Sequence, residues 1–288
     1  MAEQNIKMNV KTDTGYDTLY PQANLTNVKG TLDIKHGGTG SGTAEGARNA
    51  LGLGEISTET IHHNSVFRGK NLGTSVTTEQ YQSIANGTFK DLYVGDYWTI
   101  NGTIYRIACF DYFLNTGDTA LTKHHVVIVP DKNMYTRRMN SGDTTVGGYV
   151  GSEMYKSGLD IAKATIKKDF AGHVLSHRVF LVNAVSNGIP SNGLWANSEI
   201  ELMTEQMVYG GGIFTTAPNG SKIPFNIMIE KSQLPLFAIR PDLISNRQHF
   251  WLQNIVGASH FAFVYLSGVA SNNSASTAQG VRPYFLIS

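Results

Sequence analysis

The sequence predicts a mixed α+β fold: an extended amino-terminal arm and a short helical neck, followed by a larger head that ends in antiparallel strands. Glycine is abundant, with 30 residues among 288, and only 16% of residues are charged, which favours turns and extended chain over helical bundles. Strand-like and helix-like segments alternate irregularly, without the repeated strand–helix–strand units of a parallel sheet. The chain closes on strand-forming runs such as Phe261–Leu266.

Composition argues against some classes of binding partner. The formal net charge is +1, so no global field attracts nucleic acid or an anionic membrane. No apolar run approaches the roughly 20 residues that span a bilayer, and the amino terminus lacks the basic start and apolar core of a signal peptide. We therefore expect a soluble protein made in a cytoplasm, with no nucleic-acid partner and no membrane insertion. The single cysteine, Cys109, lies in an apolar segment and is expected to be a buried thiol.

The arm and the neck come first in the chain. Residues 1–35 alternate polar and apolar side chains without a helical period, which predicts an extended arm with a turn at Asp13–Gly15. Such a segment buries little by itself, so we expect it to dock onto a partner or a sister chain. Residues 36–54 begin with a glycine-rich turn and continue as a short helix with Thr43 as its N-cap and Gly52 at its end. The glycine cluster lacks the lysine-containing signature of a phosphate-binding loop, which argues against nucleotide binding.

Residues 55–76 form a polar connector, and the head is predicted to span residues 77–288. Its first helix begins with a capping box, Thr77–Gln80, and ends at Asn86-Gly87. Strand-forming runs on both sides of Asn101-Gly102 predict a hairpin with a tight turn.

The middle of the head carries two further capping-box patterns. Ser157–Asp160 predicts the start of one helix, and Ser198–Glu201 predicts the start of another that runs to about Tyr209. Two apolar runs, His125–Pro130 and Arg178–Val182, predict strands. The helix after Ser157 has one apolar face, made of Leu159, Ala162, Ile166 and Phe170.

The end of the chain is the predicted binding surface. Between Asn254 and Gln279, small, hydroxyl, amide and aromatic side chains are frequent and no carboxylate occurs. Such a segment is poorly suited to acid–base catalysis, whereas aromatics and short amides are typical of adaptable binding loops. An ordinary solvated hairpin is the alternative interpretation. The candidate ligand-binding residues are Asn254, Ser259, His260, Phe263, Tyr265, Ser267, Ser271, Asn272 and Asn273.

Histidine pairs are the candidate metal ligands. His173 and His177 have the i, i+4 spacing that places two imidazoles on one helix face, but Val174 stands where the zinc-protease motif has glutamate. The adjacent pairs His62-His63 and His124-His125 point apart on a helix or a strand and are poor chelates. The sequence also lacks a dense oxygen-rich loop for calcium, so we expect neither a metal nor a cofactor.

A cluster of acidic residues suggests an alternative in which the protein is an enzyme. Asp91, Asp96, Asp111 and Asp118 cluster in the sequence, and a pair of carboxyl groups can hydrolyse glycosides. Their positions at hairpin ends and in turns favour structural roles instead. No nucleophile-elbow or cysteine–histidine signature accompanies them, so we expect that the protein is not an enzyme.

The neck resembles a known family. Gly37–Gly40, followed by Thr43–Arg48 and Leu51–Leu53, is similar to the glycine-rich shaft motif of phage tail fibres. Gly15–Pro21 resembles the virion-attachment ends of tail proteins from phages of Gram-positive bacteria. The resemblance implies a threefold neck, and hence a homotrimer, and an arm that binds phage baseplate or tail proteins.

Residues 91–288 resemble a head domain of prophage tail proteins of Firmicutes. The resemblance implies a C-type-lectin-like fold whose closing strands present a ligand surface, which in some members is diversified by retroelements. Relatives have arginine where this chain has Gln253. The same fold serves formylglycine-generating enzymes, but these need a cysteine pair, and this chain has one cysteine. The matching motifs are Val94–Trp98, Gly147–Met154, Ser198–Met203, Phe250–Leu252 and Gly280–Pro283.

Together these features lead to a functional hypothesis. We expect a tail-fibre receptor-binding protein, located in the virion, that adheres to a glycan or protein on the host cell surface. Several weak sites on one particle would raise avidity by about 10²–10⁴ over a single site. Two alternatives stay open: a tail-tip depolymerase that cleaves a host glycan, and a purely structural tail component.

Overall fold

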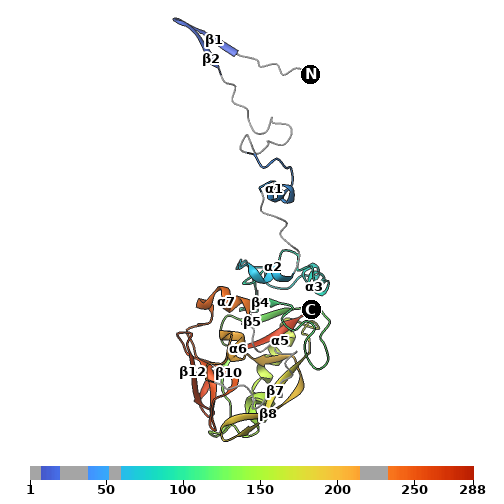
Figure 1. The fold of residues 1–288 in the computed structure, drawn as a ribbon, viewed down its shortest axis with the longest axis vertical. Coiled ribbons are helices and arrows are strands. Elements are labelled where there is room, and N and C mark those ends of the chain that lie inside the picture. The colour runs from blue at the N-terminus through green and yellow to red at the C-terminus, as the bar shows by residue number, and fades with distance from the viewer. Residues whose placement is uncertain (1–7, 20–37, 52–59, 215–232) are drawn as a thin grey trace. The chain divides into compact units, whose positions relative to one another are not determined.

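The computed structural model describes residues 8–19, 38–51, 60–214 and 233–288 (Figure 1). The chain forms two compact units, Met1–Ser57 and Thr58–Ser288. The larger unit, which we call the head, combines helices with mainly antiparallel sheets, so the predicted mixed α+β class is confirmed. No helix in the described ranges is long and apolar enough to cross a bilayer.

The first unit contains a hairpin and a short helix. Strands β1 (Met8–Thr12) and β2 (Gly15–Leu19) pair antiparallel around the predicted turn, so this part of the expected arm folds back on itself. Helix α1 (Ala44–Ala50) begins as predicted, because the Thr43 hydroxyl accepts a hydrogen bond from the Gly46 amide at 3.0 Å. Residues 1–7, 20–37 and 52–54 of the arm and neck, including Gly52, lie outside the described residues.

Two five-stranded sheets and one long hairpin build the head. The first sheet has the order β3 (Tyr97–Ile100), β4 (Thr103–Phe110), β5 (Val126–Pro130), β14 (Pro283–Ile287) and β9 (Ile200–Leu202). The second has the order β12 (Ala270–Ser274), β11 (His260–Val264), β10 (Phe250–Ile255), β13 (Ala278–Val281) and β6 (Tyr135–Arg138). The hairpin pairs β7 (His177–Ser186) with β8 (Ile189–Ser198), at the end of the head opposite to α2 and α3 (Figure 1).

Short helices connect these strands. They are α2 (Thr60–Ser65), α3 (Thr78–Ala85), α4 (Gly148–Gly151), the π-helix η3 (Met154–Gly158), α5 (Asp160–Asp169), α6 (Glu205–Tyr209), α7 (Pro235–Ile239) and the 3₁₀-helix η6 (Pro241–Leu243).

The strongest local signals are confirmed. Thr77 and Gln80 form both hydrogen bonds of the capping box at the start of α3, which ends at Asn86. Asn101 and Gly102 adopt φ angles of 49° and 83° between β3 and β4, as a primed hairpin turn requires. Every residue of β5 is buried.

The capping box predicted at Ser157 is wrong. Ser157 lies within the π-helix η3, and α5 starts after Leu159, which makes no side-chain capping bond. The Ser157 hydroxyl instead donates to the Glu153 carbonyl at 3.4 Å. The predicted apolar face of the helix is confirmed, because Leu159, Ala162, Ile166 and Phe170 are all fully buried.

The helix predicted to start at Ser198 is also wrong. Ile200 and Leu202 form β9 and pair with Phe285 and Pro283 of β14, so tertiary pairing overrides the local helix signal. The Ser198 hydroxyl donates to the buried Glu201 carboxylate at 2.7 Å rather than to a helix start. Helix α6 begins later, at Glu205, and Thr204 is its N-cap.

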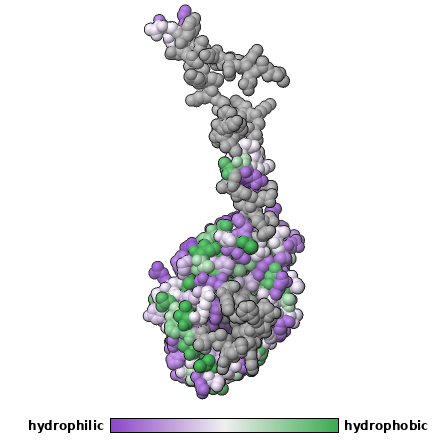
Figure 2. Space-filling model, in the orientation of Figure 1, coloured by the Kyte–Doolittle hydropathy of each residue, from purple (hydrophilic) through white to green (hydrophobic). Residues whose placement is uncertain are grey.

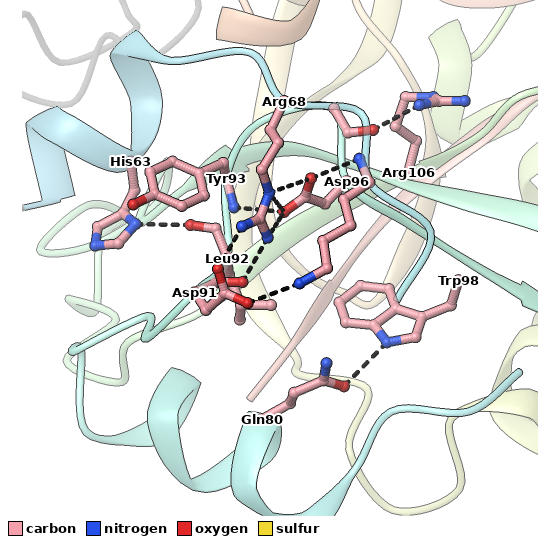
Figure 3. Close-up of polar contacts among 11 residues, drawn as sticks. His63, Arg68, Gln80, Asp91, Leu92, Tyr93, Asp96, Trp98 and Arg106 are labelled. Carbon is pink, nitrogen blue, oxygen red and sulfur yellow. Dashed lines mark hydrogen bonds and ion pairs between the residues drawn. The ribbon is translucent and has the colours of Figure 1, made fainter. Parts of the chain in front are cut away.

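The head starts before residue 77, because an ion-pair network binds the expected connector to it (Figure 3). The Asp96 carboxylate is fully buried and accepts from Arg68 Nε at 3.0 Å and Nη2 at 2.6 Å. It also accepts from the backbone amides of Lys70 and Tyr93 at 2.8 and 2.9 Å. Asp91 pairs with Lys70 and Arg68 at the surface. Residues 60–76 therefore belong to the head.

The Val94–Trp98 motif has a structural explanation in the same region. Gly95 has a φ angle of 89°, and the Phe67 ring lies where a side chain at residue 95 would be. Trp98 is fully buried, and its indole N–H donates to Gln80 Oε1 at 3.0 Å (Figure 3). The motif thus joins α3 and the connector to the first sheet.

We expect Asp96→Ala to lower the free energy of unfolding by about 3–5 kcal/mol, because the change leaves the Arg68 guanidinium and two amides without their acceptor. Asp91→Ala is the matched control: it removes a carboxylate from the same arginine, but its side chain is 61% exposed, so we expect a loss below about 1 kcal/mol. Urea unfolding of both variants measures the difference. Equal losses would contradict the role of the buried carboxylate.

Candidate functional site

The structure buries one of the predicted ligand-binding residues. Phe263 is 4% exposed and packs against Trp251 and His249, with ring centroids 6.0 and 5.3 Å apart. Its strand, β11, lies between β10 and β12, and four of its five residues are buried. Because these four residues are consecutive, side chains on both faces of β11 are covered, although strand alternation would allow one face to point outward. Phe263 is therefore a core residue of this sheet, and its burial argues against the predicted contact with a ligand.

Other predicted residues lie on or near the surface. Tyr265 is 40% exposed, and its ring centroid lies 4.5 Å from that of His249 in a tilted arrangement. Ser267 is exposed in the turn that follows. Strand β12 is the edge of its sheet, and its residues are half-buried. This edge carries the predicted residues Ser271, Asn272 and Asn273.

The remaining predicted residues have local partners. Asn254 turns toward α6, where its Oδ1 accepts from the Glu205 amide at 2.8 Å. Ser259 Oγ and His260 Nδ1 contact each other at 2.9 Å. None of the predicted ligand-binding residues lines either of the two hollows found beside the β7–β8 hairpin.

An aromatic pocket lies beside that hairpin. Phe180 on β7 and Trp195 on β8 are cross-strand partners, and their half-buried rings meet edge to face at 5.4 Å. Gly193 leaves room for the Phe180 ring, which occupies the space of a side chain there. The pocket has a volume of about 40 Å³ and is lined by Tyr112, Phe113, Arg178, Val179, Phe180, Leu181, Trp195, Thr204, Met207, Gln253 and Tyr284.

A few polar groups interrupt the apolar wall. Gln253 Nε2 donates to the Leu202 carbonyl at 3.2 Å, and Thr204 Oγ1 accepts from the Met207 amide. Arg178 is held by Asp118 through two hydrogen bonds of 2.7 Å. This pairing raises the pKa of Arg178 and lowers the pKa of Asp118. The guanidinium is therefore charged and fixed at the pocket wall.

A second, wider hollow shares the Arg178 side chain. Its volume is about 310 Å³, and it is lined by Thr119, Ala120, Leu121, Ser176, His177, Arg178 and Asn197. His177 is buried, with Nε2 3.3 Å from the Tyr284 hydroxyl, and burial lowers its pKa to about 3. The imidazole is consequently neutral at physiological pH.

The two histidines that were considered as a metal pair lie in different elements of the fold. His173 lies in the turn after α5, where its ring stacks on Tyr81 at 3.4 Å and its Nδ1 is 2.9 Å from the Ser288 carbonyl. His177 opens β7 instead of continuing a helix. Within the described ranges, no group of three His, Cys, Asp or Glu residues could hold a metal ion.

The four carboxylates considered for glycoside hydrolysis each contact a basic side chain. Asp91 and Asp96 bind Arg68, Asp118 binds Arg178, and Asp111 lies 2.8 Å from His124 Nδ1. These contacts match the structural roles expected for them. The Cys109 thiol is buried, and burial raises its pKa.

The sequence analysis predicted the strand over Arg178–Val182, which lies in β7, but missed the hairpin with β8 and did not identify Phe180 or Trp195 as site residues. A signal was present, because Asn187-Gly188 separates two strand-forming runs and adopts φ angles of 52° and 75°. The pairing of Phe180 with Trp195 follows from the register that this turn sets. That Gln253 and Tyr112 line the same pocket does not follow from it, because they come from other segments of the chain. On the face drawn in Figure 2, apolar and polar residues are interspersed, so surface hydropathy does not mark a site.

We expect Phe263→Ala to lower the free energy of unfolding by about 3–5 kcal/mol, since it removes a buried ring and leaves a cavity. Tyr265→Ala, two residues along the same chain segment, is expected to cost less than about 1 kcal/mol because its side chain lies at the surface, 40% exposed. Chemical denaturation of the two variants measures both values. A small loss for Phe263→Ala would indicate that its side chain is exposed rather than buried.

We expect stability to fall below pH 6.5, because His177 stays neutral in the folded state while the unfolded chain takes up a proton. The loss should continue toward the folded pKa of about 3. Replacing His177 by glutamine removes this titration, so between pH 7 and pH 5 the wild type should lose roughly 2 kcal/mol more than the variant. Urea unfolding at both pH values tests this; parallel losses would refute it.

The chain matches no protein-family model, no curated protein and no solved structure in comparisons with known proteins. The resemblance of its neck and head to phage tail fibres therefore stays a prediction from sequence motifs. What the aromatic pocket binds must follow from the size and chemistry of its own walls.

Proposed function

We propose that this chain is a receptor-binding tail-fibre protein of a phage or prophage, and that its C-type-lectin-like head adheres to a molecule on the host cell surface. The observation that carries the proposal is the small aromatic pocket beside Phe180 and Trp195. Ligand sites are typically concave and mostly apolar, with a few placed polar groups, and this pocket has that composition.

Preorganisation supports binding at this pocket. The Asp118 carboxylate holds Arg178 in place before any ligand arrives, so binding does not need to order the arginine side chain. Paired strands position Phe180 and Trp195, and strands hold side chains more rigidly than loops do. The edge strand β12 and Tyr265 offer a second contact surface to a large ligand.

The amino-terminal unit has a separate role in this proposal. Its hairpin and the segment around α1 attach the protein to baseplate or tail proteins and assemble three copies in the virion. The compact unit formed by residues 58–288 then presents the binding surface. Repeating one weak site on a trimer raises avidity by about 10²–10⁴ without any new contact.

We expect the purified full-length chain to bind host cells saturably and Trp195→Ala to weaken that binding at least tenfold, because interfacial tryptophans carry a large share of binding energy. Leu194→Ala is the matched control, since Leu194 is the neighbouring exposed residue on the same strand and lines neither hollow. Binding is measured with labelled protein, and unchanged thermal unfolding confirms that the variants are folded.

Other outcomes point to other functions. Equal binding by wild type and both variants would place the receptor surface elsewhere, with the β12 edge as the next region to change. Release of new reducing ends from host glycan would indicate a depolymerase. Saturable binding by none of the three proteins would indicate a structural tail component.

A further inference from the structure

We infer that the pocket beside Trp195 receives the acetamido group of an N-acetylhexosamine in a host-surface glycan. This inference rests on the proposed adhesive function and names the ligand class for it. Three features of the pocket favour an acetamido group. They are its size, its apolar wall and two hydrogen-bonding atoms that its own contacts leave unused.

The size of the pocket sets the first limit. Its volume of about 40 Å³ is well below the roughly 150 Å³ of a cavity that holds benzene. The pocket therefore suits a small substituent, such as an acetyl group, rather than a whole sugar ring. The ring must therefore stay at the mouth of the pocket.

The apolar wall of the pocket favours the methyl of the acetyl group. Tyr112, Phe180, Trp195 and Met207 surround most of the pocket with apolar atoms. Hydroxyl groups, which make up most of the substituents of a simple hexose, would lose their hydrogen bonds to water against such a wall. A methyl group loses none, so the wall favours an acetylated amine over a hydroxyl.

Two side chains supply the complementary polar atoms. Gln253 Nε2 faces the Leu202 carbonyl, which can only accept, so Gln253 Oε1 is the atom left to accept another hydrogen bond. The Thr204 hydroxyl accepts from the Met207 amide and keeps its own proton to donate. An acetamido group offers one N–H for Gln253 and one carbonyl oxygen for Thr204.

The mouth of the pocket suits the sugar ring. Trp195 is half-buried, and its exposed part offers an apolar surface to the C–H face of a pyranose. Arg178 has five N–H donors, of which Asp118 and Asn197 take three. The remaining donors can reach ring hydroxyls, because Arg178 borders both this pocket and the wider hollow.

Ligand-observed NMR titration of the full-length chain tests the inference with four probes. They are the methyl glycosides of N-acetylglucosamine, N-acetylgalactosamine, glucose and N-benzoylglucosamine. We expect at least one N-acetyl glycoside to bind at least tenfold more tightly than the glucoside, which lacks the acetamido group, and than the benzoyl compound, which is too large for the pocket. Equal affinities for all four, or binding of none, would overturn the inference.

A matched pair of variants tests the role of Gln253. Gln253→Met keeps the side-chain length and removes the acceptor, so we expect at least a tenfold loss of affinity for the N-acetyl glycoside that binds. Gln248→Met makes the same change at an exposed glutamine that lines neither hollow, and should leave the affinity unchanged. Equal affinities in the two variants, at matched thermal unfolding, would remove Gln253 from the site.

Two further readouts separate the inference from the proposed function. If the chain binds host cells but no N-acetyl glycoside, the adhesive function stands and the acetamido inference fails. If it binds the glycoside but not host cells, the pocket assignment stands and the proposed function fails. Binding of an Nε-acetyl-lysine amide as tightly as the glycoside would overturn the assignment to a sugar.

Discussion

The buried ion pair between Asp96 and Arg68 is the constraint on which the rest of the head depends. A carboxylate in this position is tolerated only because four donors surround it, and an incomplete set would cost more than the pair stabilises. These donors come from residues 68–70 and from Tyr93, so the pair ties the entering chain to the β3–β4 hairpin. That hairpin begins the sheet that continues through β5 to β14, whose Tyr284 lines the pocket.

A second buried carboxylate organises the opposite end of this sheet. Glu201 on β9 accepts from the Tyr149 hydroxyl at 2.6 Å and from the Ser198 hydroxyl at 2.7 Å. Burial raises its pKa, and the two hydroxyl donors oppose that shift. The bonds connect α4, the end of β8 and β9. The turn from β8 into β9 is thereby fixed, and this turn brings Trp195 and Thr204 to the same pocket.

The two candidate surfaces differ in how they would bind. The aromatic pocket is small and bordered by side chains that already have partners, so it suits one compact group of a ligand. The β12 edge is extended, half-buried and rich in short polar side chains, which suits broad and adaptable contact. A tail-fibre head that uses both would recognise one group of its receptor in the pocket and gain contact area from the edge.

The sequence by itself determined the elements whose signals are local. The Thr77–Gln80 capping box and the Asn101-Gly102 turn act within a few residues, so no distant partner was needed to predict them. Only the tertiary structure decided that residues 200–202 form a strand, that Phe263 is buried, and that Gln253 and Trp195 line the same pocket. Each of these depends on what lies against the segment, and burial and sheet pairing join residues whose separation along the chain carries no periodic signal.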